Sequence, residues 1–345
     1  MPGRRALRRI QFGLESTPGT PVAATARMRF NGAMLSDDRE VFFPPELVGV
    51  FGGTDRSFIQ SVTASCDLAD TPLTPEQLPY LLAMLYGGPV TGVIDGTGSS
   101  GFRYVTTVPV STTPANRSYT VEGGDDFEVE RMDYAKATRV VLKGSQQSVC
   151  MMNASLIGQE VARLGGGFSA TTLADTNDLL FAGARLFLDA AGAIGTTQIA
   201  NQFLGFEITF EATWAVKYSG EGATGAPVWS FVVFTDKSIT GRLTMEHDPA
   251  VDGNTGIKSQ LRANTTRALR IDVLGDAYAT PGTGTIFTGG RRGVRIDLPV
   301  VWTRIPPLED SEGNSIITVE FESRNNAAFG GAGSITVLNE VSALP

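Results

Sequence analysis

The chain has 345 residues, a length typical of about two domains. An apolar fraction of 42% supports a packed core and excludes a disordered chain, while 40 glycines and 18 prolines indicate β structure with long turns. The net charge of −8 excludes non-specific attraction to nucleic acid or to an anionic membrane, since both require a basic patch. No apolar run reaches about 18 residues, so no membrane-spanning helix is expected, and the arginines near the start precede no apolar segment of a secretory signal.

The first 36 residues are predicted to form an N-terminal arm. Residues such as Gly13, Pro18 and Gly19 interrupt the segment, so it cannot be a helix interior and has little periodicity. Two interpretations stay open: a flexible terminus, or a segment that becomes ordered only when it docks on a neighbouring copy.

A first β domain with one helix is predicted over residues 37–165. Strands are expected at residues 47–51, 57–68, 102–110, 117–122, 127–132, 138–143 and 148–157. The helix is predicted after Thr74, a good N-cap, with Pro75 at the first helical position and Gln77 completing a capping box. Its apolar stripe consists of Leu78, Leu81, Leu82 and Leu85. Pro79 would remove a helical hydrogen bond, so the alternative is a regular helix that begins there after a separate turn.

A connector is predicted at residues 166–183 and a second β domain at residues 184–345. Its strands are expected at 184–189, 203–218, 228–233, 238–245, 267–274, 293–303 and 316–323, its helix at 255–263, and a turn at 311–315. The segment 203–218 alternates apolar and polar residues and would reach about 50 Å at ~3.3 Å per residue. An ordinary strand has about six residues, so this segment must bend or project as a hairpin arm.

The strands between residues 266 and 323 have one apolar and one polar face, because their side chains alternate with period two. The two halves of the chain also share an order of elements. In each half a strand that ends in Asp (61–70 and 238–248) is followed by a helix and then by a sheet. This order suggests a tandem duplication, although any α+β chain with one helix per half would show it.

No credible active site is present in the sequence. His247 is the only histidine, and a metal site formed with Glu246 and Asp248 is weighed against a solvated strand end, which is favoured because strand neighbours point to opposite faces. The sequence Gly96-Thr97-Gly98-Ser99-Ser100-Gly101 matches a dinucleotide motif, but a predicted helix precedes it and a strand follows, the reverse of the required order. Cys66 and Cys150 are expected to be reduced and structural. The strand carboxylates are interpreted as the solvated face of a sheet rather than an acid–base pair. The protein is therefore predicted to be no enzyme and to hold no cofactor or metal.

Several segments carry a family resemblance in their order along the chain. They are Gly13-Leu14-Glu15-x-Thr17-x-Gly19-Thr20-Pro21-Val22, Leu78-Pro79-x-Leu81-Leu82, Tyr119-Thr120-Val121-Glu122-Gly123-Gly124-Asp125, Ile194-Gly195-Thr196-Thr197, Ala268-Leu269-Arg270-Ile271-Asp272-Val273-Leu274-Gly275 and Leu308-Glu309-Asp310-Ser311-Glu312-Gly313-Asn314. With them the chain resembles the major tail (tail tube) proteins of long, non-contractile-tailed phages, and the resemblance covers nearly its whole length.

The resemblance implies β-sandwich or barrel-like tube domains, each with a flanking helix. Copies would form rings that close a continuous β-barrel, and the rings would stack into the tail tube of the virion. Closure of a sheet removes edges that would otherwise aggregate. With two tandem tube domains, three copies would make a pseudo-hexameric ring, and a hexamer is the alternative. Assembly would take place in the host cytoplasm, and DNA would pass through an acidic lumen without specific binding. The implied partners are a tape-measure protein, a tail terminator and tail-tip proteins, with no membrane.

Two sets of residues follow as candidates from this resemblance. The candidate inter-ring arm contains Gly13, Glu15, Thr17, Gly19, Thr20 and Pro21. The candidate lumen-facing or subunit-facing charges are Glu207, Glu211, Asp272, Asp297, Glu320 and Glu322. Deletion of residues 1–30 is predicted to block ring stacking more than folding.

Two other classes of function are considered. A carbohydrate-binding or adhesin-like β protein would stack exposed Trp214, Trp229 or Trp302 on a sugar, although Trp214 and Trp302 lie on apolar faces. A glycosidase would use the strand carboxylates.

Overall fold

The fold is described from a computed structural model of the chain. It describes residues 4–345 except 32–33, 47–48, 50–55, 221–226, 248–255, 284–285 and 312. The strand predicted at 47–51 therefore lies mostly outside the described residues. The fold is mainly β and antiparallel, as predicted. Within the described part of the chain, no helix is long and apolar enough to cross a membrane.

The elements fall into two halves of the chain. The first half comprises η1 (Arg5–Leu7), β1 (Arg9–Leu14), β2 (Ala26–Met28), β3 (Leu35–Phe42), β4 (Phe58–Pro72), α1 (Leu78–Tyr86), β5 (Val93–Ile94), β6 (Phe102–Thr107), β7 (Tyr119–Gly124), β8 (Val129–Ser145), β9 (Met151–Gly158) and β10 (Val161–Arg163). The second half comprises η2 (Phe181–Gly183), β11 (Ala184–Ala190), β12 (Gln198–Ile199), β13 (Phe203–Lys217), β14 (Phe231–Glu246), α3 (Ile257–Arg262), β15 (Arg267–Ala277), β16 (Arg291–Arg304), β17 (Glu309–Ser311), β18 (Asn314–Ser323) and β19 (Ser334–Asn339).

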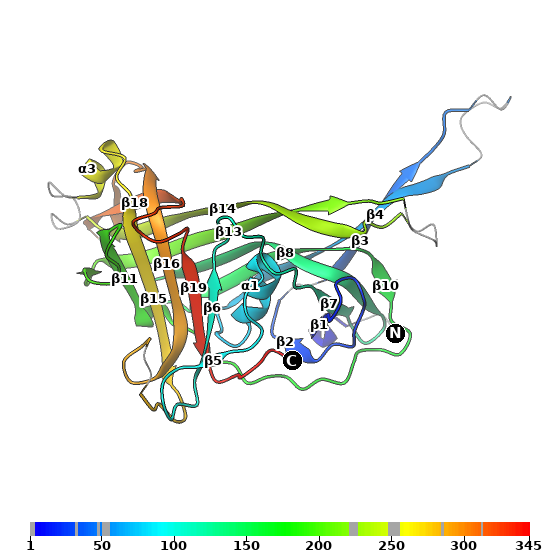
Figure 1. The fold of residues 1–345 in the computed structure, drawn as a ribbon, viewed down its shortest axis with the longest axis horizontal. Coiled ribbons are helices and arrows are strands. Elements are labelled where there is room, and N and C mark those ends of the chain that lie inside the picture. Colours follow the sequence, from blue (N-terminus) through cyan, green and yellow to red (C-terminus); the bar gives the residue numbers. More distant parts are fainter. Residues whose placement is uncertain are drawn as a thin grey trace.

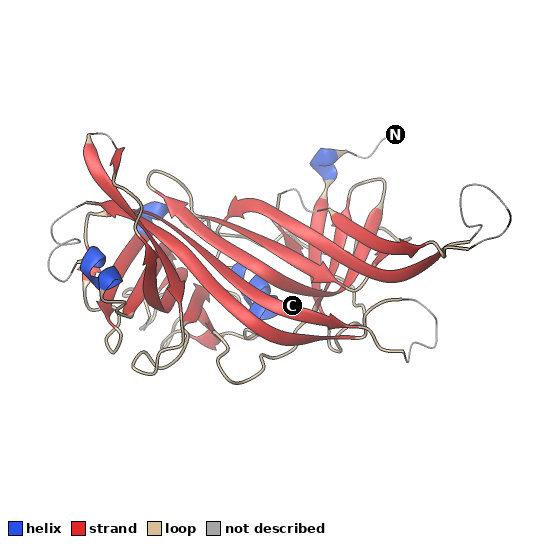
Figure 2. Cartoon of the chain, turned by 90° about the horizontal axis from the view of Figure 1, so that it is seen from above, coloured by secondary structure: helices blue, strands red, loops and turns tan. Residues whose placement is uncertain are grey.

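One long sheet runs through both halves in the order β3-β4-β9-β8-β13-β14-β18-β16. We call it the main sheet. Its long strands extend across the molecule (Figures 1 and 2), and the β3–β4 hairpin projects beyond them at one end (Figure 1). The long segment predicted at 203–218 is β13, and it pairs along its length with β14 as a hairpin.

Two smaller groups of strands cover the inner face of the main sheet. One group is β2-β1-β7-β8-β10 and the other is β12-β11-β15-β16-β19-β6-β5. Since β8 and β16 are long, each pairs with its small group through its first part and with the main sheet through its second part. The apolar faces of the strands meet in one hydrophobic core.

Helix α1 lies inside this core. All nine of its residues are buried, as expected for a helix that is apolar on every side. Its N-cap is Gln77 and Thr74 Oγ1 is buried without a hydrogen-bond partner, so the predicted cap at Thr74 is wrong. The alternative of a separate turn before the regular helix is close to the structure. Gly87 ends the helix in the left-handed region, with φ of 68°.

The two halves repeat the same pattern of strand pairing. The pairs β1–β2, β1–β7, β7–β8, β8–β10, β8–β9, β4–β9 and β3–β4 correspond to β11–β12, β11–β15, β15–β16, β16–β19, β16–β18, β14–β18 and β13–β14. Helices α1 and α3 hold the same place in the two series.

Irregularities in the strands repeat as well. The β3–β4 register slips between Glu40 and Val41, and the β13–β14 register slips between Thr213 and Trp214. Likewise, the β8–β9 register slips between Ala137 and Arg139, and the β16–β18 register between Trp302 and Arg304. A bulge is a local feature with a defined position, so these slips align the halves residue by residue. In this alignment Asp38 of the first half corresponds to Glu211 of the second half, and Arg139 corresponds to Arg304.

The strands differ from the prediction in two ways. Strand β1 lies within residues 1–36, where the sequence indicated an arm, and β3 begins at the end of that segment and continues through residues where no strand was predicted. The segments expected at 127–132 and 138–143 are one strand, β8, and those at 228–233 and 238–245 are largely one strand, β14. In both cases, a bulge or a polar stretch interrupts the alternation within a continuous strand.

Candidate functional site: a sheet with two unpaired edges

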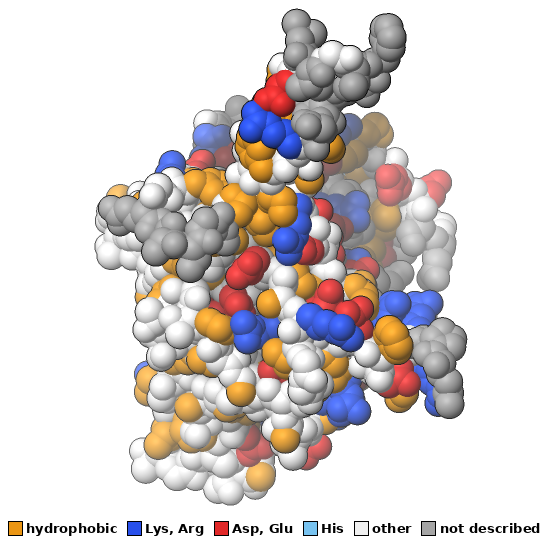
Figure 3. Space-filling view, turned by 90° about the vertical axis from the view of Figure 1, so that its right-hand side faces the viewer, with side chains coloured by type: hydrophobic (Ala, Val, Ile, Leu, Met, Phe, Trp, Pro, Cys, Tyr) orange, Lys and Arg blue, Asp and Glu red, His pale blue; other side chains and the backbone are white. Residues whose placement is uncertain are grey.

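The main sheet ends at β3, which pairs with β4 on one side and with no other strand of the described chain. All but its first residue are exposed. The side chains around the base of the β3–β4 hairpin are apolar, and Val41 and Ile59 are 44% and 38% exposed. The exposed pair Phe42 and Phe58 adds two rings with centroids 5.2 Å apart. Figure 3 shows hydrophobic side chains gathered at this end of the molecule, below the projecting hairpin.

The other end of the main sheet is the last part of β16. Strand β15 pairs with β16 only as far as Val300, and β18 pairs with the opposite side of Val300–Arg304. Residues 301–304 therefore have one strand neighbour in the described chain. The exposed Arg304 lies at this edge, with Nη1 3.7 Å from Oε1 of Glu320.

Between these two ends, the halves meet where β13 pairs with β8. The paired residues run from Glu211 opposite Arg139 to Gly205 opposite Ser145. Strand β13 takes the same place in its half as β3 does in the first half, and β8 corresponds to β16. The pairing of β13 with β8 thus joins the counterpart of β3 to the counterpart of β16 within one chain, and we call it the internal joint.

Side chains from both halves seal this internal joint. The Trp214 ring is 6% exposed and lies over the Lys136 ammonium, with Nζ 3.8 Å from the ring centroid. Beyond the β13–β14 hairpin, the fully buried Trp229 donates from Nε1 to the carbonyl of Gly158, and its ring centroid is 4.6 Å from that of Tyr134. The aromatic side chains of the joint are therefore buried like those of a domain interior.

Lys136 is an unusual member of this joint, because its side chain is fully buried. Its Nζ donates to the carbonyl oxygen of Arg117 at 2.8 Å. Burial lowers the pKa of the Lys136 amine to about 7, and the nearby Glu15 carboxylate opposes that shift. The amine is thus close to losing its charge at neutral pH.

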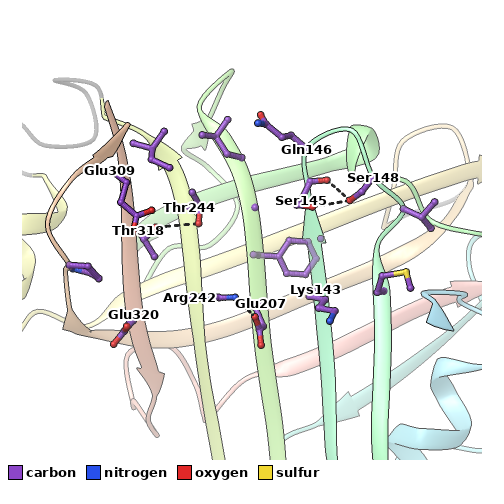
Figure 4. Close-up of a pocket in the computed structure, with 18 residues that line it drawn as sticks. Lys143, Ser145, Gln146, Ser148, Glu207, Arg242, Thr244, Glu309, Thr318 and Glu320 are labelled. Carbon is purple, nitrogen blue, oxygen red and sulfur yellow. Dashed lines mark hydrogen bonds and ion pairs between the residues drawn. The ribbon is translucent and has the colours of Figure 1, made fainter. Parts of the chain in front are cut away.

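The outer face of the main sheet carries a row of alternating charges. In register across five strands lie Lys143, Glu207, Arg242, Glu320 and Arg304, which we call the charge row. Figure 4 shows its first four members on neighbouring strands. They line part of a groove of about 670 Å³. Arg242 Nη2 is 2.7 Å from Glu207 Oε2.

The first member of the row is balanced by a carboxylate beside it. Lys143 Nζ lies 2.6 Å from Asp70 Oδ2, and hydrogen bonds from Asn153 and from Lys143 lower the pKa of Asp70. Each cation of the row therefore has an acidic neighbour, and the face is balanced in charge rather than strongly acidic.

The predicted charged residues fall on two different faces. Glu207, Glu211, Glu320 and Glu322 belong to main-sheet strands and lie on the outer face. Asp272 and Asp297 lie on the small group of the second half, where Arg295 Nε is 2.7 Å from Asp272 Oδ1 and Arg270 Nε is 2.7 Å from Asp297 Oδ1. These two pairs are mostly buried, so the predicted set does not form a single surface.

The candidate arm residues are folded against their own chain. The buried Glu15 carboxylate accepts hydrogen bonds from the Gly19 and Tyr134 N–H groups and from the Ser118 and Thr120 hydroxyls, at 2.6–3.0 Å. A Cβ on Gly13 would lie 2.6 Å from the Ala23 carbonyl oxygen.

The rest of this motif closes a turn next to Glu15. Thr20 N–H donates to the carbonyl of Thr17, Gly19 has φ of 80°, and Pro21 follows in an extended segment. In this structure the motif builds a turn over β7 and β8. Its contact with a neighbouring ring stays a prediction.

The remaining chemical candidates lie apart from one another. No group of three His, Cys, Asp or Glu residues in the described ranges could hold a metal ion, and Asp248 lies outside those ranges. Cys66 and Cys150 are buried free thiols, and burial raises the pKa of each to about 12. Trp214, Trp229 and Trp302 are all buried, so none presents a ring to a sugar.

A mainly-β chain whose long sheet ends in two edges without a second strand neighbour in the described residues, and whose outer sheet face is balanced in charge, has features suited to assembly. Over residues 6–342 the chain matches the family described as phage tail tube protein. It therefore belongs to the phage tail tube protein family and is a structural component of the virion tail. No curated protein matches the chain.

Sequence reasoning missed β3, which is the strand at the unpaired edge. Residues 36–40 are all polar or charged, so no apolar alternation marks them as a strand. The internal repeat was the available signal, but the sequence shows it only as an order of elements. The slips at Glu40 and Thr213, which align β3 with β13, become visible only in the strand pairing.

Proposed function

We propose that this protein assembles into closed rings that stack into the phage tail tube, and that the tube conducts DNA into the host. The observation that carries the proposal is the main sheet with its two unlike, unpaired edges. An edge strand with exposed apolar neighbours is a liability in a monomer, and closure into a barrel removes it.

The size of the sheet supports a ring of three copies. Each copy would add eight strands to a common barrel. With strands ~4.8 Å apart and tilted by ~40°, 24 strands enclose a barrel about 48 Å across between backbones. Six copies would give about twice that diameter on the same estimate. The trimer is favoured over the hexamer because three copies with two repeated halves each supply the six units of a pseudo-hexameric ring.

The uncovered face of the main sheet, called its outer face above, would line the lumen of such a barrel. The opposite face is covered by the hydrophobic core and would lie toward the outside of the tube. Glu207, Glu211, Glu320 and Glu322 would then face the lumen with their basic neighbours, while Asp272 and Asp297 would lie in the outer wall. DNA would meet cations already paired with carboxylates, which favours passage over retention.

The partners proposed with this function are those that a tube requires. A tape-measure protein would occupy the growing tube, and a tail terminator and tail-tip proteins would close its ends. Assembly would take place in the host cytoplasm.

Electron microscopy tests the proposal. Purified protein, alone or seeded with tail-initiation complexes, is expected to give hollow tubes whose end-on views have three copies per ring. Six copies per ring would replace the trimer by the hexamer. Monomers under every condition, including seeding, would contradict the proposed function.

A further inference from the structure

We infer that β3 of one copy pairs with the free edge of β16 in the next copy, in the register that β13 and β8 use inside the chain. This inference rests on the proposed self-assembly and specifies the surface, the partner and the alignment. The partner is a second copy of this chain, since the chain already contains the matching joint once.

Bulge positions fix the register. Glu211 lies two residues before the slip in β13, and Asp38 lies two residues before the slip in β3. Arg139 and Arg304 each come directly after the slips in β8 and β16. Inside the chain Glu211 is opposite Arg139, so the same joint between copies places Asp38 opposite Arg304.

The free edge of β16 begins at the matching point. Strand β7 leaves the edge of β8 at Ala135, four residues before Arg139, where the β13 pairing starts. Strand β15 leaves the edge of β16 at Val300, four residues before Arg304. The second half therefore has an open site at the position where the first half holds β13.

Charge is preserved at the joint. The internal pair is acidic Glu211 with basic Arg139, whose Nε lies 3.9 Å from the Glu211 carboxylate. The pair between copies would be acidic Asp38 with basic Arg304, and both side chains are exposed in the single chain. Complementary charges of this kind fix the register of an interface and disfavour wrong alignments.

The apolar surface is complementary too. Trp214 and Phe234 of the internal joint align with Val41 and Ile59, which are exposed in the single chain. Lys136, which covers Trp214, aligns with Val301. An apolar side chain of the next copy would thus cover the apolar patch at the base of the β3–β4 hairpin.

The joint between copies differs from the internal one beyond Arg304. The counterpart of the β8 segment after Arg139 contains Pro306 and Pro307, and neither has an N–H to donate. The internal ladder runs from Arg139 to Ser145, so in the same register Arg304 is the last residue of β16 to face β3, and Asp37 and Ser36 face Ile305 and Pro306 beyond the end of the strand. The backbone ladder between copies is therefore much shorter than the internal ladder, and side chains carry most of the contact.

Charge reversal tests the register. Asp38→Arg and Arg304→Asp are each expected to raise the concentration needed for ring assembly by roughly tenfold, because each places like charges in contact. The double variant is expected to restore assembly. The control is the exposed in-chain pair Arg163 and Glu128, 3.2 Å apart, reversed in the same way. It is expected to leave assembly unchanged.

Mixing the two single variants adds a readout of ring parity. An Asp38→Arg copy and an Arg304→Asp copy place opposite charges at the joint between them. A ring with an even number of copies can alternate the two variants, so its assembly is expected to recover fully. A three-membered ring always keeps one joint with like charges, so its assembly is expected to recover in part. Either recovery supports the register, and no recovery in the mixture or in the double variant overturns it.

Disulfide trapping gives a second, direct test. Residues directly opposite on antiparallel strands have Cα atoms about 4.5–5.5 Å apart, within disulfide range. Oxidised rings of the Asp38→Cys, Arg304→Cys variant are expected to yield covalent oligomers, while the shifted pair Ser36→Cys, Arg304→Cys yields few. Wild-type rings together with equal trapping of both pairs would overturn the register alone. Failure of the wild type to form rings would instead overturn the proposed function.

Discussion

The two long hairpins of this protein are the same element in two environments. The β13–β14 hairpin lies against β8, and its Trp214 is buried by a side chain from the other half. The β3–β4 hairpin has the same bulge at the same place, yet its outer edge has no strand neighbour in the described chain and its apolar side chains face solvent. The difference supports the proposal that the first hairpin pairs with a second copy of the chain.

The largest effect is expected from deletion of residues 1–30, which removes β1 and β2. Ile10 and Phe12 are buried in the core, and Phe12 packs against Tyr80 and Tyr119. Truncation of one buried aromatic residue costs about 3–5 kcal/mol, so loss of the whole strand is expected to unfold the first half.

The structure thus reverses the weighting of the sequence-based prediction, in which the deletion acts mainly on stacking. Circular dichroism and thermal unfolding of the truncated protein are the measurements. A folded truncated monomer that fails only to stack would support the arm. It would contradict the assignment of these residues to the core.

The next largest effect is expected from substitutions at aligned positions of the two hairpins, which distinguish a buried hairpin from an exposed one. Trp214→Ala is expected to destabilise the monomer by about 3–5 kcal/mol, because it opens a cavity in the internal joint. The aligned change Val41→Ala removes an exposed side chain and is expected to alter monomer stability by less than about 0.5 kcal/mol, while it weakens ring assembly. Urea unfolding and sedimentation measure the two quantities. An equal loss of monomer stability in both variants would show that the hairpins have equivalent surroundings.

The buried and the exposed hairpin also differ in how well the sequence predicts their strands. Apolar alternation identified β13, β15, β16 and β18, since one face of each is in the core. It could not identify β3, all but one of whose residues are exposed in the single chain, because periodicity reports only the contrast between a buried and a solvated face. It also could not reveal that Glu15 is buried, because three of the four residues that donate hydrogen bonds to its carboxylate lie more than 100 positions away.

The shared order of elements was a weak signal of repetition, and it became specific only with the pairing. Bulges at Glu40 and Thr213 leave no residue pattern that a sequence comparison of two such divergent halves could align. The polar residues of the main sheet were recognised as a solvated face, but their cross-strand neighbours depend on register. The charge row could therefore not be assembled from the sequence.

A pH-dependent effect is expected at Lys136, the residue that covers Trp214. Its folded pKa of about 7 lies below the ordinary lysine pKa of 10.5, so between these values the unfolded chain holds a proton that the folded chain lacks. Stability from this group therefore rises with pH across that window, and the burial penalty is complete below pH of about 7. Lys136→Met removes the penalty, so its stability advantage is expected to fall by about 1.4 kcal/mol per pH unit from pH 7 upwards.

Urea unfolding of wild type and Lys136→Met at pH 6, 7, 8 and 9 measures this difference, at protein concentrations below assembly. A difference that stays constant from pH 6 to pH 9 would show that the Lys136 amine does not change its charge in the folded protein.

The smallest effect is expected at the ion pairs of the two joints. Arg139 and Glu211 are each about half exposed and 3.9 Å apart, so Glu211→Gln is expected to change monomer stability by less than about 0.5 kcal/mol. The aligned change Asp38→Asn leaves the monomer equally unaffected but removes an attraction between copies, so it slows ring assembly, most clearly at low salt. Assembly kinetics of both variants at two salt concentrations provide the measurement. If Glu211→Gln slowed assembly as much as Asp38→Asn, the two aligned carboxylates would have the same role, and the division into an internal joint and a joint between copies would lose its basis.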